Sequence, residues 1–217
     1  MPEIDNLVGN GIGVEIQGYT RATEEMMSET PTREDAWALL TEYTDNPSLI
    51  KHALGVEAAM RAYARMYGED EEMWASIGLI HDFDYQQNPT EETHLHVGTG
   101  ILRERGWPEE WVRIVASHAD YMGVPRDSQA AKVLFAVDEL SGFLTACALV
   151  RPDKAIAEVK VKSVKKKLKD KAFARGVNRD DVRNGAEELG VDLGEHIEFV
   201  RDAMATISDQ LELPPRA

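Results

Sequence analysis

Hydrophobic positions recur at helical spacing through most of the chain after residue 31. They repeat three and four residues apart, the pattern of helices that bury one face. Asn46-Pro47 opens a segment that should run to Tyr67, where Gly68 ends it. Further helices are predicted over residues 32–43, 71–81, 93–105, 108–118, 128–150, 153–160, 161–168, 178–190 and 193–211. No run alternates apolar and polar residues for long enough to predict a strand, so we expect an all-α fold.

Residues 1–30 differ from the rest of the chain. They contain four glycines between positions 9 and 18 and little core-forming periodicity, which predicts a flexible or loosely docked extension. A helical domain is predicted for residues 31–217, with a ligand core over 46–150 and a C-terminal helical part over 151–217. The sequence has no apolar stretch of about 20 residues, no visible secretory signal and a single cysteine. We therefore expect a cytoplasmic protein with no membrane partner.

Charge is unevenly distributed along the chain. The net charge of −15 argues against binding to a nucleic acid polymer. Residues 151–183 are the exception, with 12 lysines and arginines against 5 acidic residues. This stretch is expected either to contact a substrate phosphate or to form a solvated face. The predicted phosphate contacts are Arg151, Lys154, Lys162 and Lys165.

The most informative chemical feature is the doublet His81-Asp82, which closes an apolar segment. Five of the six histidines lie between positions 52 and 118, and Asp138 lies inside a later apolar helix. Imidazole nitrogen and carboxylate oxygen are natural ligands for divalent ions. A carboxylate flanked by Val137 and Leu140 is costly to bury unless it is paired or metal-bound. Because the candidates fall on separate helices, a shared site would lie in the core of a bundle. The plainer alternative is a core histidine beside a helix-terminal aspartate. The candidates are His52, His81, Asp82, His94, His118 and Asp138.

This order of histidines and aspartates resembles the HD-domain superfamily of metal-dependent phosphohydrolases. Carried over by position, the four defining ligands are His52, His81, Asp82 and Asp138. In binuclear members two histidines follow, one in a His-x-x-x-Gly-Ala segment and one opening a His-His or His-Thr pair. His94 and His118 occupy these places, although Thr99 and Ala119 depart from the pattern, and His96 is the alternative to His94. The C-terminal part resembles a subgroup of uncharacterised predicted HD hydrolases.

The resemblance implies an HD-like helical bundle with one or two divalent ions in its core, whether Mn, Zn, Fe, Co or Mg. It implies hydrolysis of a nucleotide or another small phosphorylated metabolite by metal-activated water. Asp82 would bridge the ions, and Asp84 would orient the water or donate a proton to the leaving group, or else cap a loop. The alternatives are a di-iron oxygenase with the same ligand order and a non-catalytic regulatory module. Residues 1–30 would then tether a partner or pack across a homodimer.

Overall fold

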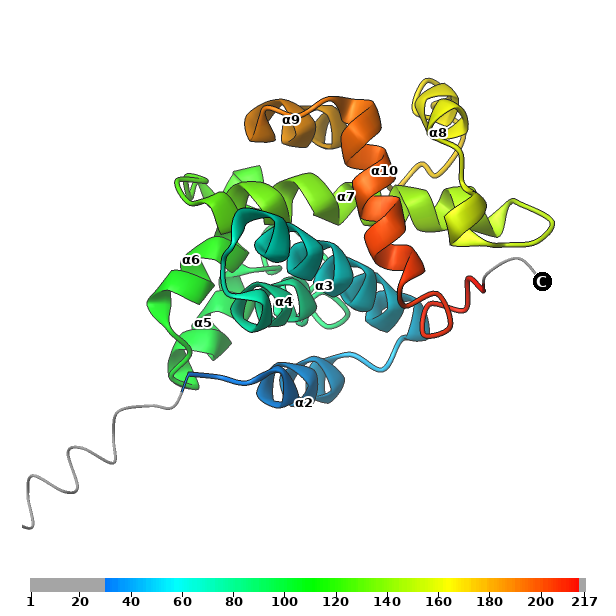
Figure 1. The fold of residues 1–217 in the computed structure, drawn as a ribbon. Coiled ribbons are helices and arrows are strands. Elements are labelled where there is room, and N and C mark those ends of the chain that lie inside the picture. Colours follow the sequence, from blue (N-terminus) through cyan, green and yellow to red (C-terminus); the bar gives the residue numbers. More distant parts are fainter. Residues whose placement is uncertain (1–29, 215–217) are drawn as a thin grey trace, which may run out of the picture. The chain divides into compact units, whose positions relative to one another are not determined.

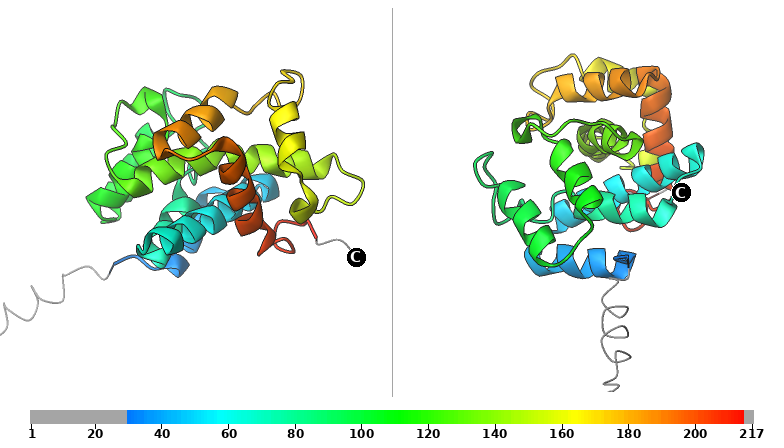
Figure 2. Two further views of the ribbon diagram at one scale, coloured as in Figure 1. Left: turned by 45° about the horizontal axis from the view of Figure 1, so that its top comes forward. Right: turned by 90° about the vertical axis from the view of Figure 1, so that its left-hand side faces the viewer.

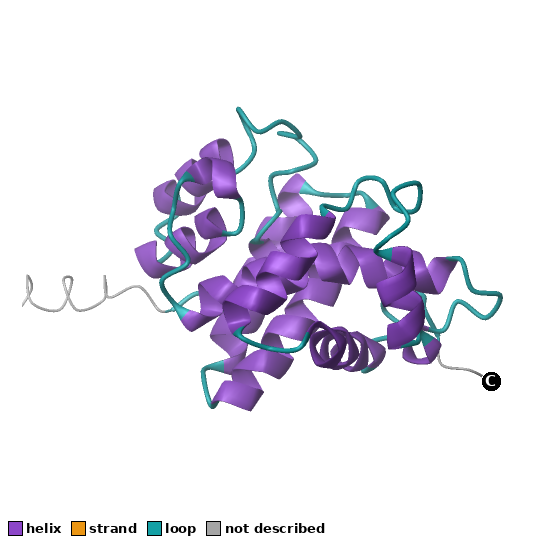
Figure 3. Ribbon diagram, turned by 90° about the horizontal axis from the view of Figure 1, so that it is seen from above, coloured by secondary structure: helices purple, strands orange, loops and turns teal. Residues whose placement is uncertain are grey.

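The computed structural model describes residues 30–214, and within that range every regular element is a helix (Figures 1 and 3). The all-α prediction is confirmed. The extension predicted for residues 1–30 lies outside the described residues apart from Thr30. The α-helices are α2 (Arg33–Tyr43), α3 (Pro47–Tyr67), α4 (Glu71–Ile80), α5 (His96–Glu104), α6 (Glu109–Ser117), α7 (Gln129–Leu149), α8 (Val161–Lys167), α9 (Arg179–Leu189) and α10 (Leu193–Ala205). Two short 3-10 turns, Asp120–Met122 and Ile156–Glu158, complete the elements.

Local signals fix where the long helices begin and end. The Asn46 side chain caps α3 by accepting from the backbone N–H of Ser48, and Pro47 needs no partner at the first position. Gly68 ends the helix with φ 75°, a conformation that costs glycine little. Ser128 caps α7 and Asn178 caps α9 in the same way. These predicted boundaries are confirmed.

The core forms where α7 lies between two groups of helices. It packs against α3 on one side and α9 on the other, while α4 packs along α3 (Figures 1 and 2). In the right-hand view of Figure 2, α7 is seen nearly end-on between them. Met60, Ile77, Leu134 and Phe143 are fully buried in this core. Burying each such side chain contributes about 1.5–3 kcal/mol, so the core rigidly relates the helices that carry the candidate ligands.

Three predicted helices differ from the structure. The helix predicted over 193–211 ends at Ala205 and is followed by turns. Residues 153–160 form a turn and the short 3-10 segment rather than a helix, and Lys154 has φ 50°. The helix predicted from residue 93 begins only at His96, because Leu95 has φ 61° and cannot continue a right-handed helix. Within residues 30–214, each helix is too short or too polar to cross a bilayer.

The connection that follows α4 carries several candidate residues and is fixed to the link between α2 and α3. The Thr44 hydroxyl donates to the Phe83 carbonyl at 2.9 Å. Gln86 Oε1 accepts from the backbone N–H groups of Asp45 and Asn46, both at 3.0 Å. The His81-Asp82 doublet is therefore held at both ends, by α4 before it and by these bonds after it.

Candidate metal centre

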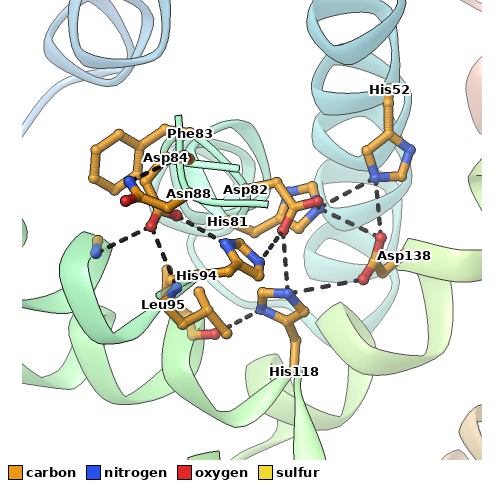
Figure 4. A network of polar contacts seen from close by, with 12 residues as sticks. His52, His81, Asp82, Phe83, Asp84, Asn88, His94, Leu95, His118 and Asp138 are labelled. Carbon is orange, nitrogen blue, oxygen red and sulfur yellow. Dashed lines mark hydrogen bonds and ion pairs between the residues drawn. The ribbon is translucent and has the colours of Figure 1, made fainter. Parts of the chain in front are cut away.

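Side chains from five separate elements converge beside α7 (Figure 4). They form two groups, and in each group the potential ligand atoms lie within 4.8 Å of one another. Asp82 belongs to both groups. The first group is His52, His81, Asp82 and Asp138, and the second is Asp82, His94 and His118. The structure thus brings together all six residues that the sequence predicted as ligands.

The first group gathers nitrogen and oxygen atoms at close range. His52 Nε2 lies 3.2 Å from His81 Nε2 and 3.0 Å from Asp138 Oδ1. His81 Nδ1 donates to the Gly78 carbonyl at 2.7 Å, so the neutral ring presents the lone pair of Nε2 to the centre. His81 is fully buried. Its orientation is therefore set by the last turn of α4.

The second group is organised around one oxygen atom of Asp82. Oδ1 of Asp82 lies 3.1 Å from His94 Nε2 and 3.3 Å from His118 Nε2. His118 Nδ1 donates to the Val115 carbonyl at 2.6 Å. His94 Nδ1 lies 3.0 Å from Asp84 Oδ1, to which it donates. Both rings therefore turn Nε2 toward Asp82.

The chemistry of these donor atoms fits a bound cation. Outward bonds from Nδ1 to a carbonyl or carboxylate are the usual support of metal-ligating histidines. Because both neighbouring rings carry their proton on Nδ1, Asp82 Oδ1 is buried without a hydrogen-bond donor in the described chain. Lone pairs that face one another at about 3 Å require a positive charge between them. A divalent ion in each group would supply it.

Without a metal, protons take up part of this role. Burial lowers the pKa of His81 and His118, but the charges of Asp82 and Asp138 outweigh it and raise the pKa of both rings. Burial likewise lowers the pKa of His94, yet Asp82 and Asp84 raise it to about 9. Burial raises the pKa of the Asp138 carboxyl, but the neighbouring imidazoles lower it further, to a net value below its usual range.

Asp84 has a different place from the predicted catalytic one. It is 0% exposed and is not among the residues that line the cavity beside the metal groups. Besides His94, its carboxylate accepts from the backbone N–H groups of Leu95 and Gly98, at 3.3 and 3.1 Å. It therefore orients His94 and caps α5 instead of contacting water or a leaving group. Of the two roles considered for Asp84, the geometry favours the loop cap.

His96 does not join either group. It is exposed at the start of α5, with its ring 6.2 Å from that of Tyr121. The backbone turns between them at Leu95, which has φ 61°, and His94 is buried whereas His96 is exposed. The choice left open by the sequence is thus made by geometry in favour of His94.

The metal groups open into a cavity of about 470 Å³. Tyr85, Tyr121 and Phe135 form part of its wall. Four further carboxylates, which the sequence analysis did not single out, also line it: Glu91, Asp120, Glu139 and Asp181. Burial and then the charge of Asp138 raise the pKa of Glu139 to about 7. The position of Glu139 next to Asp138 was a local signal for this wall. Asp181 gave none, because it lies on α9, far from Asp138 in the sequence.

The predicted phosphate contacts lie elsewhere. Arg151 pairs with Asp153 at 2.9 Å, and Lys165 lies 3.7 Å from Asp192. Lys162 and Lys165 border a separate surface hollow on α8. The reason is the length of α7, which runs 11 residues beyond Asp138 to Leu149, or roughly 16 Å at 1.5 Å per residue. The four predicted phosphate contacts, Lys154 included, are therefore absent from the cavity lining.

Comparison with known proteins agrees with this geometry. Residues 49–142 match the sequence model of the HD domain family, a range that includes all six candidate ligands. No curated protein and no solved structure matches the chain. The likeness of the C-terminal part to one subgroup stays a prediction. Through residues 49–142, the chain belongs to the HD-domain superfamily.

Proposed function

We propose that this protein is a metal-dependent phosphohydrolase acting on a nucleotide or another small phosphorylated metabolite. HD domains are generally metal-dependent hydrolases, and this one has a histidine and aspartate cluster that could hold metal. The observation that carries the proposal is the sharing of Asp82 between two ligand groups. One carboxylate common to two cation sites is suited to a pair of ions acting on one phosphate.

Bound divalent ions would supply Lewis-acid chemistry, making a water molecule acidic and offsetting phosphate charge. The chain's own residues hold the ligands in place. The bonds from Nδ1 fix three imidazole rings, and Asp84 links His94 to the first turn of α5. Orientation of this kind lets the ligands meet an ion without rearrangement. Tyr85, Tyr121 and Phe135 form part of the cavity wall beside the centre.

The size of the cavity supports a small substrate. A volume of about 470 Å³ lies within the range of small-molecule sites. Its acidic wall is unsuited to a nucleic acid polymer, which binds through basic surfaces. The proposal therefore concerns a metabolite rather than a polymer.

The test is metal content followed by phosphate release. Protein purified without a histidine tag or chelator should retain or take up about two equivalents of metal, as a binuclear centre requires. His94→Ala should lose one equivalent, whereas His96→Ala, the exposed neighbour, should keep both. The loaded protein should release phosphate from members of a metabolite panel with Mn, Zn, Co or Mg. A chain that takes up no metal on titration would refute the proposal.

A di-iron oxygenase is the second candidate, and the complete second group is what favours it. His94 and His118 complete, with Asp82, a ligand set that can hold a second iron ion. Predominant iron, a mixed-valent electron paramagnetic resonance signal and oxygen consumption would support this chemistry. Phosphate release under anaerobic conditions with manganese would support hydrolysis instead. A chain with no metal at all would support a regulatory module.

A further inference from the structure

The cavity beside the metal groups is lined by carboxylates that those groups do not use. Glu91, Asp120, Glu139 and Asp181 join Asp82 and Asp138 in its wall. In the described part of the chain, none of the 15 lining residues is a lysine or arginine. Sites for polyphosphates commonly supply arginine or lysine along the whole anion. Here positive charge would come only from metal ions at one end.

An arginine that contacts this wall, Arg126, has its charge already engaged. Arg126 lies 2.7 Å from Asp120 and 2.8 Å from Glu188, and its guanidinium covers the Phe135 ring at 3.7 Å. Asp120 therefore has a basic partner, which it shares with Glu188. Across residues 30–214, Glu91, Glu139 and Asp181 make no ion pair with a basic side chain. Three acidic side chains without a basic partner therefore line the space that a substrate would fill.

The start of α9 reinforces the acidic wall. A helix N-terminus normally attracts anions through its free N–H groups. At α9 the Asn178 side chain accepts from the N–H groups of Asp180 and Asp181, at 3.1 and 3.4 Å. Both Asn178 and the Asp181 carboxylate line the cavity. This end of the helix is therefore closed to a phosphate.

Two tyrosines give the cavity surfaces that suit a cation. Tyr85 and Tyr121 line it and remain 39% and 38% exposed. The Tyr85 ring is held edge-on to His94, with ring centroids 5.1 Å apart. Aromatic faces attract ammonium groups, and attraction increases where water is restricted. Carboxylates and aromatic rings together are the surroundings that a substituted ammonium prefers.

We propose that the substrate carries a positive charge beyond its phosphate, as a protonated amine or a quaternary ammonium. The phosphate would face the metal groups, and the cationic end would face Glu91, Asp181 and the tyrosines. This inference rests on the proposed function for its phosphate end. It disfavours nucleotides, because further phosphates or other anionic groups would lie against the unpaired carboxylates.

The first test measures binding of phosphonates, which a phosphohydrolase cannot cleave. Three compounds of similar length are compared on the metal-loaded full chain by calorimetry: 3-aminopropylphosphonate, butylphosphonate and 2-carboxyethylphosphonate. The aminopropyl compound should bind at least tenfold more tightly than the butyl compound, and the carboxyethyl compound most weakly. Equal affinities, tighter binding of the carboxyethyl compound, or no binding of any of the three would overturn the inference.

Adjacent acidic residues provide matched controls. Asp181→Asn and Glu91→Gln should each lower the affinity ratio of aminopropyl to butyl compound at least threefold. Asp180→Asn and Glu92→Gln remove the same charge one residue away, outside the cavity lining, where Asp180 pairs with Arg183. They should leave the ratio unchanged. An equal fall of the affinity ratio in all four variants would show that net charge causes the preference for the aminopropyl compound, and it would overturn the inference.

Hydrolysis of the corresponding phosphate esters separates this inference from the proposed function. If the amine preference holds in binding but no ester is cleaved, the hydrolase proposal fails and the charge preference stands. If esters are cleaved but those with anionic ends are favoured, the hydrolase proposal stands and the charge preference fails. Preferential cleavage of the aminopropyl ester would support both.

Discussion

Replacing Gly98 by alanine should damage the second ligand group without touching a ligand. A Cβ atom at this position would lie 2.7 Å from Cγ of Asp84 and 2.8 and 3.0 Å from its two oxygen atoms. Ordinary contacts begin near 3.4 Å, so the carboxylate would have to move. Asp84 is fully buried and cannot move into solvent. The displacement therefore falls on its bonds to His94 and to the start of α5.

The magnitude follows from those bonds. Hydrogen bonds to a charged group contribute about 1.5–3 kcal/mol each, and we expect the loss to equal about one of the three that Asp84 accepts. The higher helix propensity of alanine stabilises the folded state by about 1 kcal/mol and offsets part of this loss. The net cost to the free energy of unfolding should be about 0.5–2 kcal/mol. Loss of an outer contact to a metal-binding histidine typically weakens metal affinity about 10–100-fold.

Gly100→Ala is the matched control, two residues further along α5. A Cβ atom there meets no other atom within 4 Å. This variant should bind metal as wild type does and gain up to about 1 kcal/mol in the free energy of unfolding. Urea denaturation and metal titration with element analysis measure both quantities. If Gly98→Ala binds its second equivalent with wild-type affinity, the assigned role of Asp84 is wrong.

Three further predictions concern the shared aspartate and a buried pair outside the metal groups. Asp82→Ala should remove both equivalents of metal, because this residue belongs to both groups; retention of one full equivalent on element analysis would show that it is not shared. Tyr63→Phe should cost about 1–3 kcal/mol in urea denaturation, because the Tyr63 hydroxyl donates to buried His196 Nδ1 at 2.6 Å; a cost below about 0.5 kcal/mol would contradict this. Burial lowers the pKa of His196 below its usual 6.5, against a smaller opposing effect of its bond to Ala136. Below pH 6.5 the unfolded chain therefore binds more protons at this position, and stability falls by up to about 1.4 kcal/mol per pH unit until the folded-state pKa is reached. Comparing wild type with His196→Gln at pH 7.5 and 5.5 isolates this contribution; an unchanged difference between the two proteins would contradict it.

Features with local causes were predictable from the sequence. Asn46, Ser128 and Asn178 cap helices because their short side chains reach N–H groups two or three residues away. The doublet His81-Asp82 was recognisable because both ligand types stand together after a buried helix. The other candidates were recognisable as histidines between positions 52 and 118 and an aspartate inside an apolar helix. The resemblance then added which of them should act as ligands.

Features that depend on distant packing were not predictable. Asp84 looks like a catalytic candidate because it lies two residues beyond the doublet, yet its direction is set by the N–H groups of Leu95 and Gly98. The positive φ of Leu95, which separates His94 from His96, has no signal in a leucine. The basic residues after 150 resemble phosphate contacts in composition, but the length of α7 carries them away from the cavity.

Part of the acidic wall comes from outside the range that matches the HD domain, and this separates what the family match explains from what it does not. All six candidate ligands lie within residues 49–142, the range that matches the HD domain. Asn178 and Asp181 lie outside it and reach the cavity only because α9 packs along α7. The match therefore covers the residues able to hold metal ions, whereas the start of α9 adds a part of the wall that lies outside the match. If the wall selects the substrate, exchanging charges on α9 should alter which phosphate ester is preferred while leaving the number of bound metal ions unchanged.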